Sequence, residues 1–100
     1  MKKLFIAAFM LVSSFGTNVM ADGHAIKMGI ILGFTGPIES LTPAMAGSAE
    51  LAFKEASDSG SLLGGKKIEV VRADSTCVDS AAATAAAEGV ISQGVAAIMG

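Results

Sequence analysis

Apolar and polar positions follow two different periods along the chain beyond residue 25, and together they predict strands that alternate with helices. Residues 26–32 are rich in apolar and β-branched side chains, and their second half is apolar on both faces, as in a strand covered on both sides. Residues 67–73 alternate more strictly, which indicates a more exposed place in the same sheet. A short apolar run over residues 95–100 predicts a third strand.

The segment between the first two strands has the spacing of an amphipathic helix. Thr42 is a good N-cap, Pro43 suits the first helical position, and Gly60 is a plausible C-terminal cap. Glu50 and Lys54 are expected to form an i,i+4 ion pair on the outer face. The residues expected on the inner face share helical spacing: Met45, Ala49, Ala52, Phe53 and Ala56.

A second helix is predicted on the alanine-rich segment before the third strand. Asp79 or Ser80 would cap it, it would continue through Gln93, and Val90 and Ile91 would anchor it. The resulting order of strand, helix, strand, helix and strand predicts an α/β fold. We expect the first βαβαβ part of an open, parallel, doubly wound sheet. No helix follows the third strand, so we expect this part to be incomplete and the chain to be a fragment of a longer protein.

The N-terminus has the three parts of a secretory signal peptide. A positive start, Met1–Lys3, precedes an apolar run from Leu4 to Val12, and Val19 and Ala21 are small residues spaced for cleavage. The apolar run would rise roughly 14 Å as a helix, well short of the ~30 Å core of a bilayer. We therefore expect residues 1–21 to be removed after Ala21, and the mature chain to be exported.

Charge and cysteine content narrow the classes of partner. Beyond residue 21 the chain has five basic and nine acidic residues, a net charge of about −4. No basic stripe remains, which argues against nucleic acid as a partner. The single cysteine, Cys77, cannot form a disulfide within the chain. It is expected to be a small core residue or to pair with a cysteine beyond residue 100.

Residues for catalysis or metal binding are sparse, so we expect no enzyme, no cofactor and no metal. His24 is the only histidine and lies near the predicted cleavage site, remote from Cys77. Residues 60–67 have the glycine and lysine spacing of a phosphate-binding P-loop, but Lys67 stands where Ser or Thr is needed. The segment also joins a helix to a strand, whereas a P-loop joins a strand to a helix.

Two loops follow the carboxyl ends of the first two predicted strands, where open α/β sheets bind ligands. The first loop contains Thr35, Gly36 and Pro37, and its backbone N–H groups could seat a carboxylate. Its glycines could equally serve only to make a turn. Asp74 begins the second loop and is expected to hydrogen-bond nearby loop amides.

Several segments occur in an order and spacing typical of one protein family. They are Ile26–Ile30, Gly36–Pro37, Ala44–Ala52, Gly64–Val71, Asp74–Cys77 and Val95–Gly100. Together they resemble the opening of branched-chain (leucine, isoleucine and valine) amino-acid-binding proteins. These are the type I periplasmic solute-binding proteins of ABC transporters, and the likeness covers essentially all of residues 22–100.

The resemblance implies two lobes that close over an amino acid, with residues 22–100 forming the N-terminal part of the first lobe. It implies capture of branched-chain or similar amino acids and their delivery to permease subunits in the inner membrane. Leu41, four residues past the Gly-Pro pair, would form an apolar wall of the ligand site or a core position. The main ligand contacts, and a disulfide partner for Cys77, would lie beyond Gly100. A sensing lobe of a signalling receptor is an alternative, and so is binding of amides, urea or aromatic acids.

Overall fold

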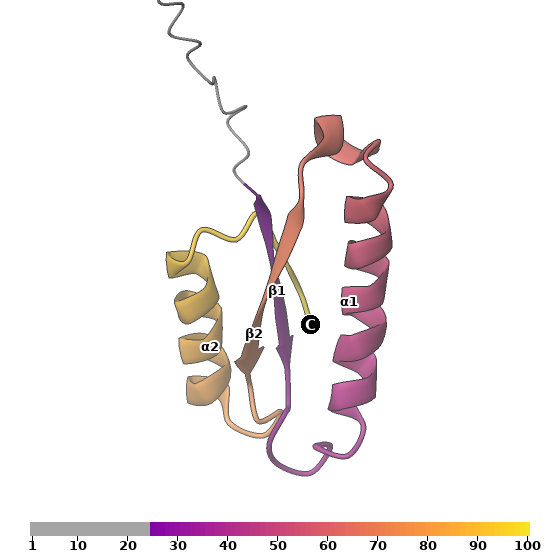
Figure 1. Ribbon diagram of the computed structural model, residues 1–100. Coiled ribbons are helices and arrows are strands. Elements are labelled where there is room, and N and C mark those ends of the chain that lie inside the picture. Colours follow the sequence, from indigo (N-terminus) through magenta and orange to yellow (C-terminus); the bar gives the residue numbers. More distant parts are fainter. Residues whose placement is uncertain (1–24) are drawn as a thin grey trace, which may run out of the picture.

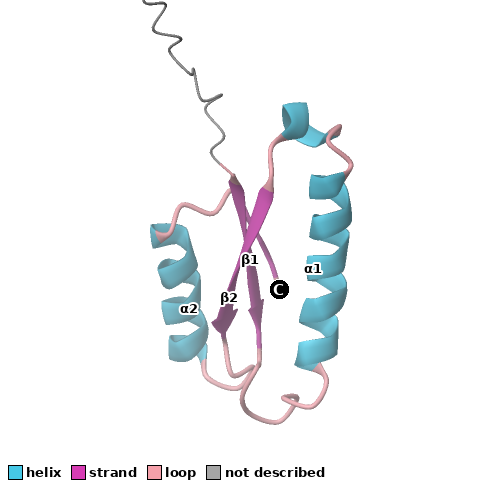
Figure 2. Ribbon diagram, viewed as in Figure 1, coloured by secondary structure: helices cyan, strands magenta, loops and turns pink. Residues whose placement is uncertain are grey.

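The computed structural model describes residues 25–100, and the predicted signal peptide, residues 1–21, lies outside them. Strands alternate with helices along the chain (Figure 2). In chain order the elements are β1 (Ile26–Leu32), α1 (Thr42–Asp58), the 3₁₀ helix η1 (Leu62–Gly65), β2 (Ile68–Asp74), α2 (Ser80–Ser92) and β3 (Ala97–Met99). None of the helices within residues 25–100 is long and apolar enough to cross a bilayer.

The three strands form one parallel sheet in the order β2-β1-β3. This arrangement confirms the predicted α/β fold with parallel crossover connections. β2 lies at an edge of the sheet, as its alternating pattern indicated, and β1 lies at the centre. The register pairs Leu32 with Asp74, so β1 and β2 end side by side.

The two long helices cover opposite faces of the sheet, α1 on one and α2 on the other (Figure 1). On the α1 face, Ile30 and Leu32 are buried against Ala46. On the α2 face, a Cβ placed on Gly29 would lie 3.4 Å from the side chain of Val90. Neighbouring residues of β1 therefore point to opposite helices, as the two-residue period of a strand requires.

The start of α1 differs from the prediction at one position. Leu41 occupies the N-cap and makes no side-chain cap bond, so Thr42 is already helical. The Thr42 hydroxyl is buried and donates to the carbonyl of Gly33 over 3.0 Å, which ties the helix to the end of β1. The predicted cap of α2 is confirmed, because the Asp79 side chain accepts from two helix amides.

The inner face of α1 is rotated from the predicted one. Met45 and Ala52 are exposed, whereas Ala46 and Ser57 are buried. The other three predicted inner residues are half-buried: Ala49, Phe53 and Ala56. The alanine content of this helix gives its faces similar hydrophobicity, so sequence spacing alone did not fix which residues meet the sheet. For the same reason Ile91 of α2 is 61% exposed, although Val90 is buried as predicted.

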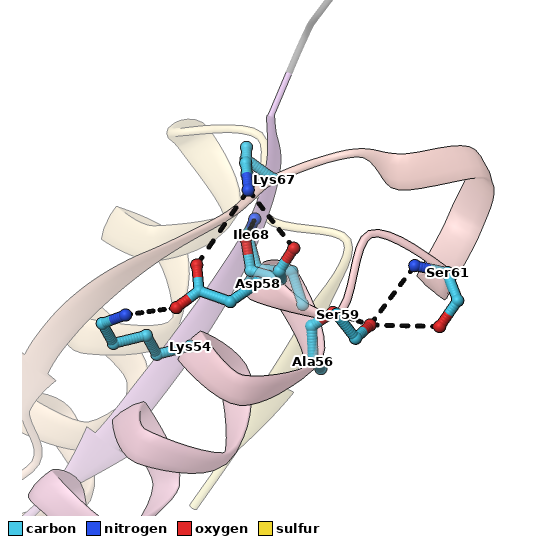
Figure 3. Close-up of polar contacts among 8 residues, drawn as sticks. Lys54, Ala56, Asp58, Ser59, Ser61, Lys67 and Ile68 are labelled. Carbon is cyan, nitrogen blue, oxygen red and sulfur yellow. Dashed lines mark hydrogen bonds and ion pairs between the residues drawn. The ribbon is translucent and has the colours of Figure 1, made fainter.

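The ion pairs of α1 also differ from the predicted Glu50–Lys54 pair, which is absent from the described residues. Glu50 instead accepts two hydrogen bonds from Arg72 of β2, over 2.5 and 2.7 Å. Lys54 pairs with Asp58 one turn further along the helix, and Lys67 lies 4.0 Å from the same carboxylate (Figure 3). The guanidinium of Arg72 is planar and donates to both oxygens of the Glu50 carboxylate, which favours Arg72 over the flexible Lys54 as the partner of Glu50.

Candidate functional site

The loops that follow β1 and β2 leave the sheet at the same edge and lie side by side (Figure 1). The first loop is residues 33–41 and the second is residues 75–79. The amide of Ser75 donates to the carbonyl of Leu32 over 3.0 Å, so the loops are joined where they begin. We call these two loops, together with Asp74, the carboxyl edge. It is the place where open parallel sheets bind ligands.

Asp74 connects the two loops through three hydrogen bonds. Its Oδ2 accepts from the Thr35 hydroxyl over 2.5 Å, and its Oδ1 accepts from the Thr35 amide over 3.3 Å. Oδ1 also accepts from the amide of Thr76 over 2.9 Å. The Thr35 hydroxyl, followed by the Thr76 amide, holds the pKa of Asp74 below its ordinary value. The carboxylate is therefore ionised at neutral pH. The expected bonds to loop amides are confirmed, and the Thr35 hydroxyl is an additional partner.

The two loops also approach each other too closely for side chains at two positions. A Cβ on Gly36 would lie 2.7 Å from the carbonyl oxygen of Thr76, and Gly36 has a positive φ of 97°. A Cβ on Gly33 would lie 2.7 Å from the Sγ atom of Cys77. These glycines therefore do more than make a turn, because they allow the first loop to pack directly on the second.

The second loop has two consecutive non-glycine residues in the left-handed region. Thr76 has a φ of 58° and Cys77 a φ of 62°. Such conformations are uncommon for residues with a side chain and cluster at functional sites. Within the described residues, the buried Oγ1 of Thr76 has no hydrogen-bond partner. The loop is thus held in a strained conformation by its contacts with the first loop.

Cys77 is exposed and free within residues 25–100. The interpretation of Cys77 as a buried core residue is therefore wrong. Its Sγ lies 3.6 Å from the Ser75 hydroxyl. The alternative, a disulfide with a cysteine outside the described residues, stays a prediction.

The residues predicted to contact a ligand lie in the first loop and face solvent. Thr35, Gly36 and Pro37 are all exposed. Leu41 is 60% exposed, so it is not a core residue of this part of the chain. The structure therefore brings all four to one accessible edge, next to Asp74 and the second loop.

One hollow on the surface of residues 25–100 lies at the carboxyl edge. It has a volume of about 340 Å³ and is lined by Ser75, Cys77, Val78, Asp79, Ser80 and Ala83. A further hollow, of about 440 Å³, lies between α1 and β2 beside the Lys54–Asp58 pair. Within the described residues, no group of three side chains is placed to hold a metal ion.

Comparison with known families and proteins gives one match. The model of a family described as periplasmic binding protein matches residues 25–100, which is every residue that the structure describes. No curated protein matches the sequence.

Proposed function

Because that family model matches three quarters of the sequence, the chain belongs to the periplasmic binding protein family, and we propose that it captures a small ligand at its carboxyl edge. The observation that supports this site is the joining of the two loops by Asp74. The hydrogen bonds of Asp74 fix the position of the first loop relative to the second. In the first loop, Thr35 is exposed near the start and Leu41 is exposed at the end. A pre-formed loop loses less conformational freedom when a ligand binds, which favours affinity.

We further propose that the ligand is a branched-chain amino acid or a close analogue. Leu41 is 60% exposed, and Met45, one helical turn later, is 50% exposed. Two large apolar side chains on the rim of a polar edge suit a ligand with a polar end and an aliphatic end. The segments quoted above, from Ile26–Ile30 to Val95–Gly100, support the same class of ligand.

In this proposal the protein binds without catalysis and delivers its ligand to ABC-transporter permease subunits in the inner membrane. Closure of two lobes over the ligand would present a shape that the permease recognises. The signal peptide would be cleaved after Ala21, and the mature protein would work in the periplasm. That oxidising compartment suits a disulfide between the exposed Cys77 and a cysteine outside residues 25–100.

A thermal-shift screen of the full-length protein tests the proposal. The panel contains the twenty amino acids, small amides, urea and aromatic acids. Leucine, isoleucine or valine is expected to raise the melting temperature selectively, since a ligand at 100 times its Kd stabilises the native state by about 2.7 kcal/mol. A selective response to amides or aromatic acids would show that the ligand class is wrong.

Two matched substitutions test the position of the site. Leu41→Ala removes an exposed leucine from the carboxyl edge, and Leu51→Ala removes one that is 56% exposed from the middle of α1. Leu41→Ala is expected to weaken leucine binding by about tenfold, as measured by calorimetry, because an apolar pocket loses part of its wall. Leu51→Ala should leave the affinity unchanged. Equal affinities for the two variants would place the ligand away from Leu41.

A further inference from the structure

Arg72 of β2 is held by two side chains from other parts of the fold. Its Nε donates to Oε1 of Glu50 over 2.5 Å, and its Nη2 donates to Oε2 over 2.7 Å. The central carbon of the guanidinium, Cζ, lies 5.3 Å from the centroid of the Phe34 ring. A cation at this distance over a ring is attracted by the electron-rich face of the ring. We call these three residues the Glu50–Arg72–Phe34 stack.

The stack joins α1 to the start of the first loop. Glu50 lies near the middle of α1, and Phe34 is the second residue of the loop. Arg72 pairs with Ile30 in the register of the sheet, so its side chain lies on the α1 face of the sheet, as that of Ile30 does. Phe34 is half-buried and packs against the core that contains Ile30. The first loop therefore starts from a ring that contacts both the core and a guanidinium held by the helix.

Two roles are open to Arg72 at this position. Residues 33–41 and 74–79 contain no lysine, arginine or histidine, so Arg72 is the cation nearest to them along β2. It could bind the carboxylate of a ligand, or it could support the first loop. The Glu50 carboxylate already occupies two donors of Arg72 in the paired geometry with which arginine binds carboxylates. These hydrogen bonds hold the pKa of Glu50 below its ordinary value, so Glu50 is ionised at neutral pH and retains Arg72.

We propose that Arg72 is a positioning residue for the ligand site: held by Glu50, it supports Phe34 and thereby keeps the first loop in the conformation that binds the ligand. This inference rests on the proposed function, which places the ligand against the first loop. It deepens that function by naming two side chains outside both loops on which the affinity depends. Neither Arg72 nor Glu50 contacts the ligand in this proposal.

NMR of the full-length protein without ligand tests the stack itself. The Nε proton of Arg72 is expected to give a resolved signal that is displaced by the ring current of Phe34, because the guanidinium lies over the ring. Phe34→Leu should remove this displacement, whereas Phe34→Tyr keeps the ring and should retain it. An Arg72 signal that is the same in Phe34→Leu and in the wild-type protein would overturn the inference.

Amide hydrogen exchange tests whether the stack positions the first loop. Within this loop, the amides of Glu39 and Leu41 donate to carbonyls of the same loop. Arg72→Met is expected to speed their exchange about two- to fivefold, the effect of losing a cation–π contact at an exposed site. Lys54→Met is the matched control, because it removes the exposed ion pair of Lys54 with Asp58 elsewhere on α1 and should leave these rates unchanged. Unchanged rates in Arg72→Met would contradict the proposal.

Calorimetry with leucine separates support of the loop from binding of the ligand's carboxylate. Arg72→Met is expected to weaken leucine binding about two- to fivefold, and Lys54→Met to leave it unchanged. Glu50→Gln removes the charge that holds Arg72 and should also weaken leucine binding. If Arg72 instead bound the carboxylate of leucine, its release in Glu50→Gln would strengthen binding. Stronger binding by Glu50→Gln, or an unchanged affinity in Arg72→Met, would overturn the inference.

Failure of the inference and failure of the proposed function give different results. If the wild-type protein binds no leucine, the proposed ligand class is wrong, and the NMR signals and exchange rates still decide whether Arg72 holds the first loop. Exposed ion pairs contribute little to stability, so all variants are expected to fold. Their melting temperatures check this expectation.

Discussion

Three residues of the carboxyl edge have their backbone in the left-handed region, and only Gly36 among them lacks a side chain. Thr76 and Cys77 have φ values of 58° and 62°. A left-handed residue with a side chain costs about 1–2 kcal/mol, so the surrounding contacts must compensate. The bond from the Thr76 amide to Asp74, whose carboxylate also accepts from Thr35 of the first loop, is one such contact. The conformation of the second loop therefore depends on the first.

Replacing Gly36 by alanine should break this dependence. Its φ of 97° is unfavourable for alanine, and the new Cβ would lie 2.7 Å from the Thr76 carbonyl. We expect the free energy of unfolding to fall by about 2 kcal/mol, measured by urea denaturation. Gly47→Ala is the control, because a Cβ there meets nothing within 4 Å and should stabilise α1 by about 0.5–1 kcal/mol. Equal effects of the two substitutions would show that the loops can separate.

The two long helices begin in different ways, although each follows a strand. α2 has a side-chain cap, since Asp79 accepts from the amides of Ala81 and Ala82 over 2.8 and 3.3 Å. α1 has none, and its first residue is held by the bond from Thr42 to the end of β1. The start of α2 is thus determined locally, whereas the start of α1 depends on the rest of the fold.

Removing the cap of α2 should have a moderate effect on stability. Asp79→Ala is expected to lower the free energy of unfolding by about 1 kcal/mol, because two helix amides lose their acceptor. Urea denaturation of the full-length protein, followed by circular dichroism, measures the change. Ser80→Ala, at the next exposed position, is the control and should alter stability by less than about 0.5 kcal/mol. A larger loss from Ser80→Ala than from Asp79→Ala would contradict the assignment of the cap.

The difference between a helix start that is determined locally, as in α2, and one that depends on the rest of the fold, as in α1, explains which elements could be predicted from the sequence. The bounds of β1 were predicted without error, and those of β2 and α2 to within one residue, because period, glycines and caps act locally. The inner face of α1 and the partner of Glu50 were not predicted. Both depend on how the helix lies against β2, where Arg72 is placed.

The candidate site was predictable to a similar degree. Loops that follow the carboxyl ends of parallel strands lie at one edge of the sheet, and this rule predicted that Thr35 and Asp74 lie at the same edge, as the structure shows. Their hydrogen bond was not predicted, because residues 39 positions apart leave no periodic signal in a sequence. The left-handed backbone of Thr76 and Cys77 was missed because neither residue type marks a turn.

At the scale of the whole molecule, the described residues have a small hydrophobic core on each face of the sheet. Ile30, Leu32 and Ala46 are the buried apolar residues under α1, and Val90 is the buried one under α2. Ile30 is fully buried at the centre of the middle strand. Stability therefore depends heavily on few side chains.

Shortening Ile30 tests this dependence. Ile30→Ala is expected to lower the free energy of unfolding by about 2–5 kcal/mol. The substitution would leave a cavity under α1, and few neighbouring side chains could move to fill it. Thermal and urea unfolding of the full-length protein measure the loss. Ile91→Ala is the matched control: its side chain is 61% exposed, and its removal should cost less than about 0.5 kcal/mol. Similar losses for the two variants would contradict the described core.

The strand order β2-β1-β3 also determines when β1 can pair on both of its edges. β1 precedes both of its neighbours in the chain, and Met28 pairs with Ala97. A polypeptide synthesised from its N-terminus therefore presents β1 first, and the edge of β1 that faces β3 stays unpaired until residues 97–99 have followed. Contacts between distant parts of a chain form slowly and leave apolar strands open to aggregation in the meantime. Among the described strands, the first to emerge is thus the last to obtain both of its neighbours.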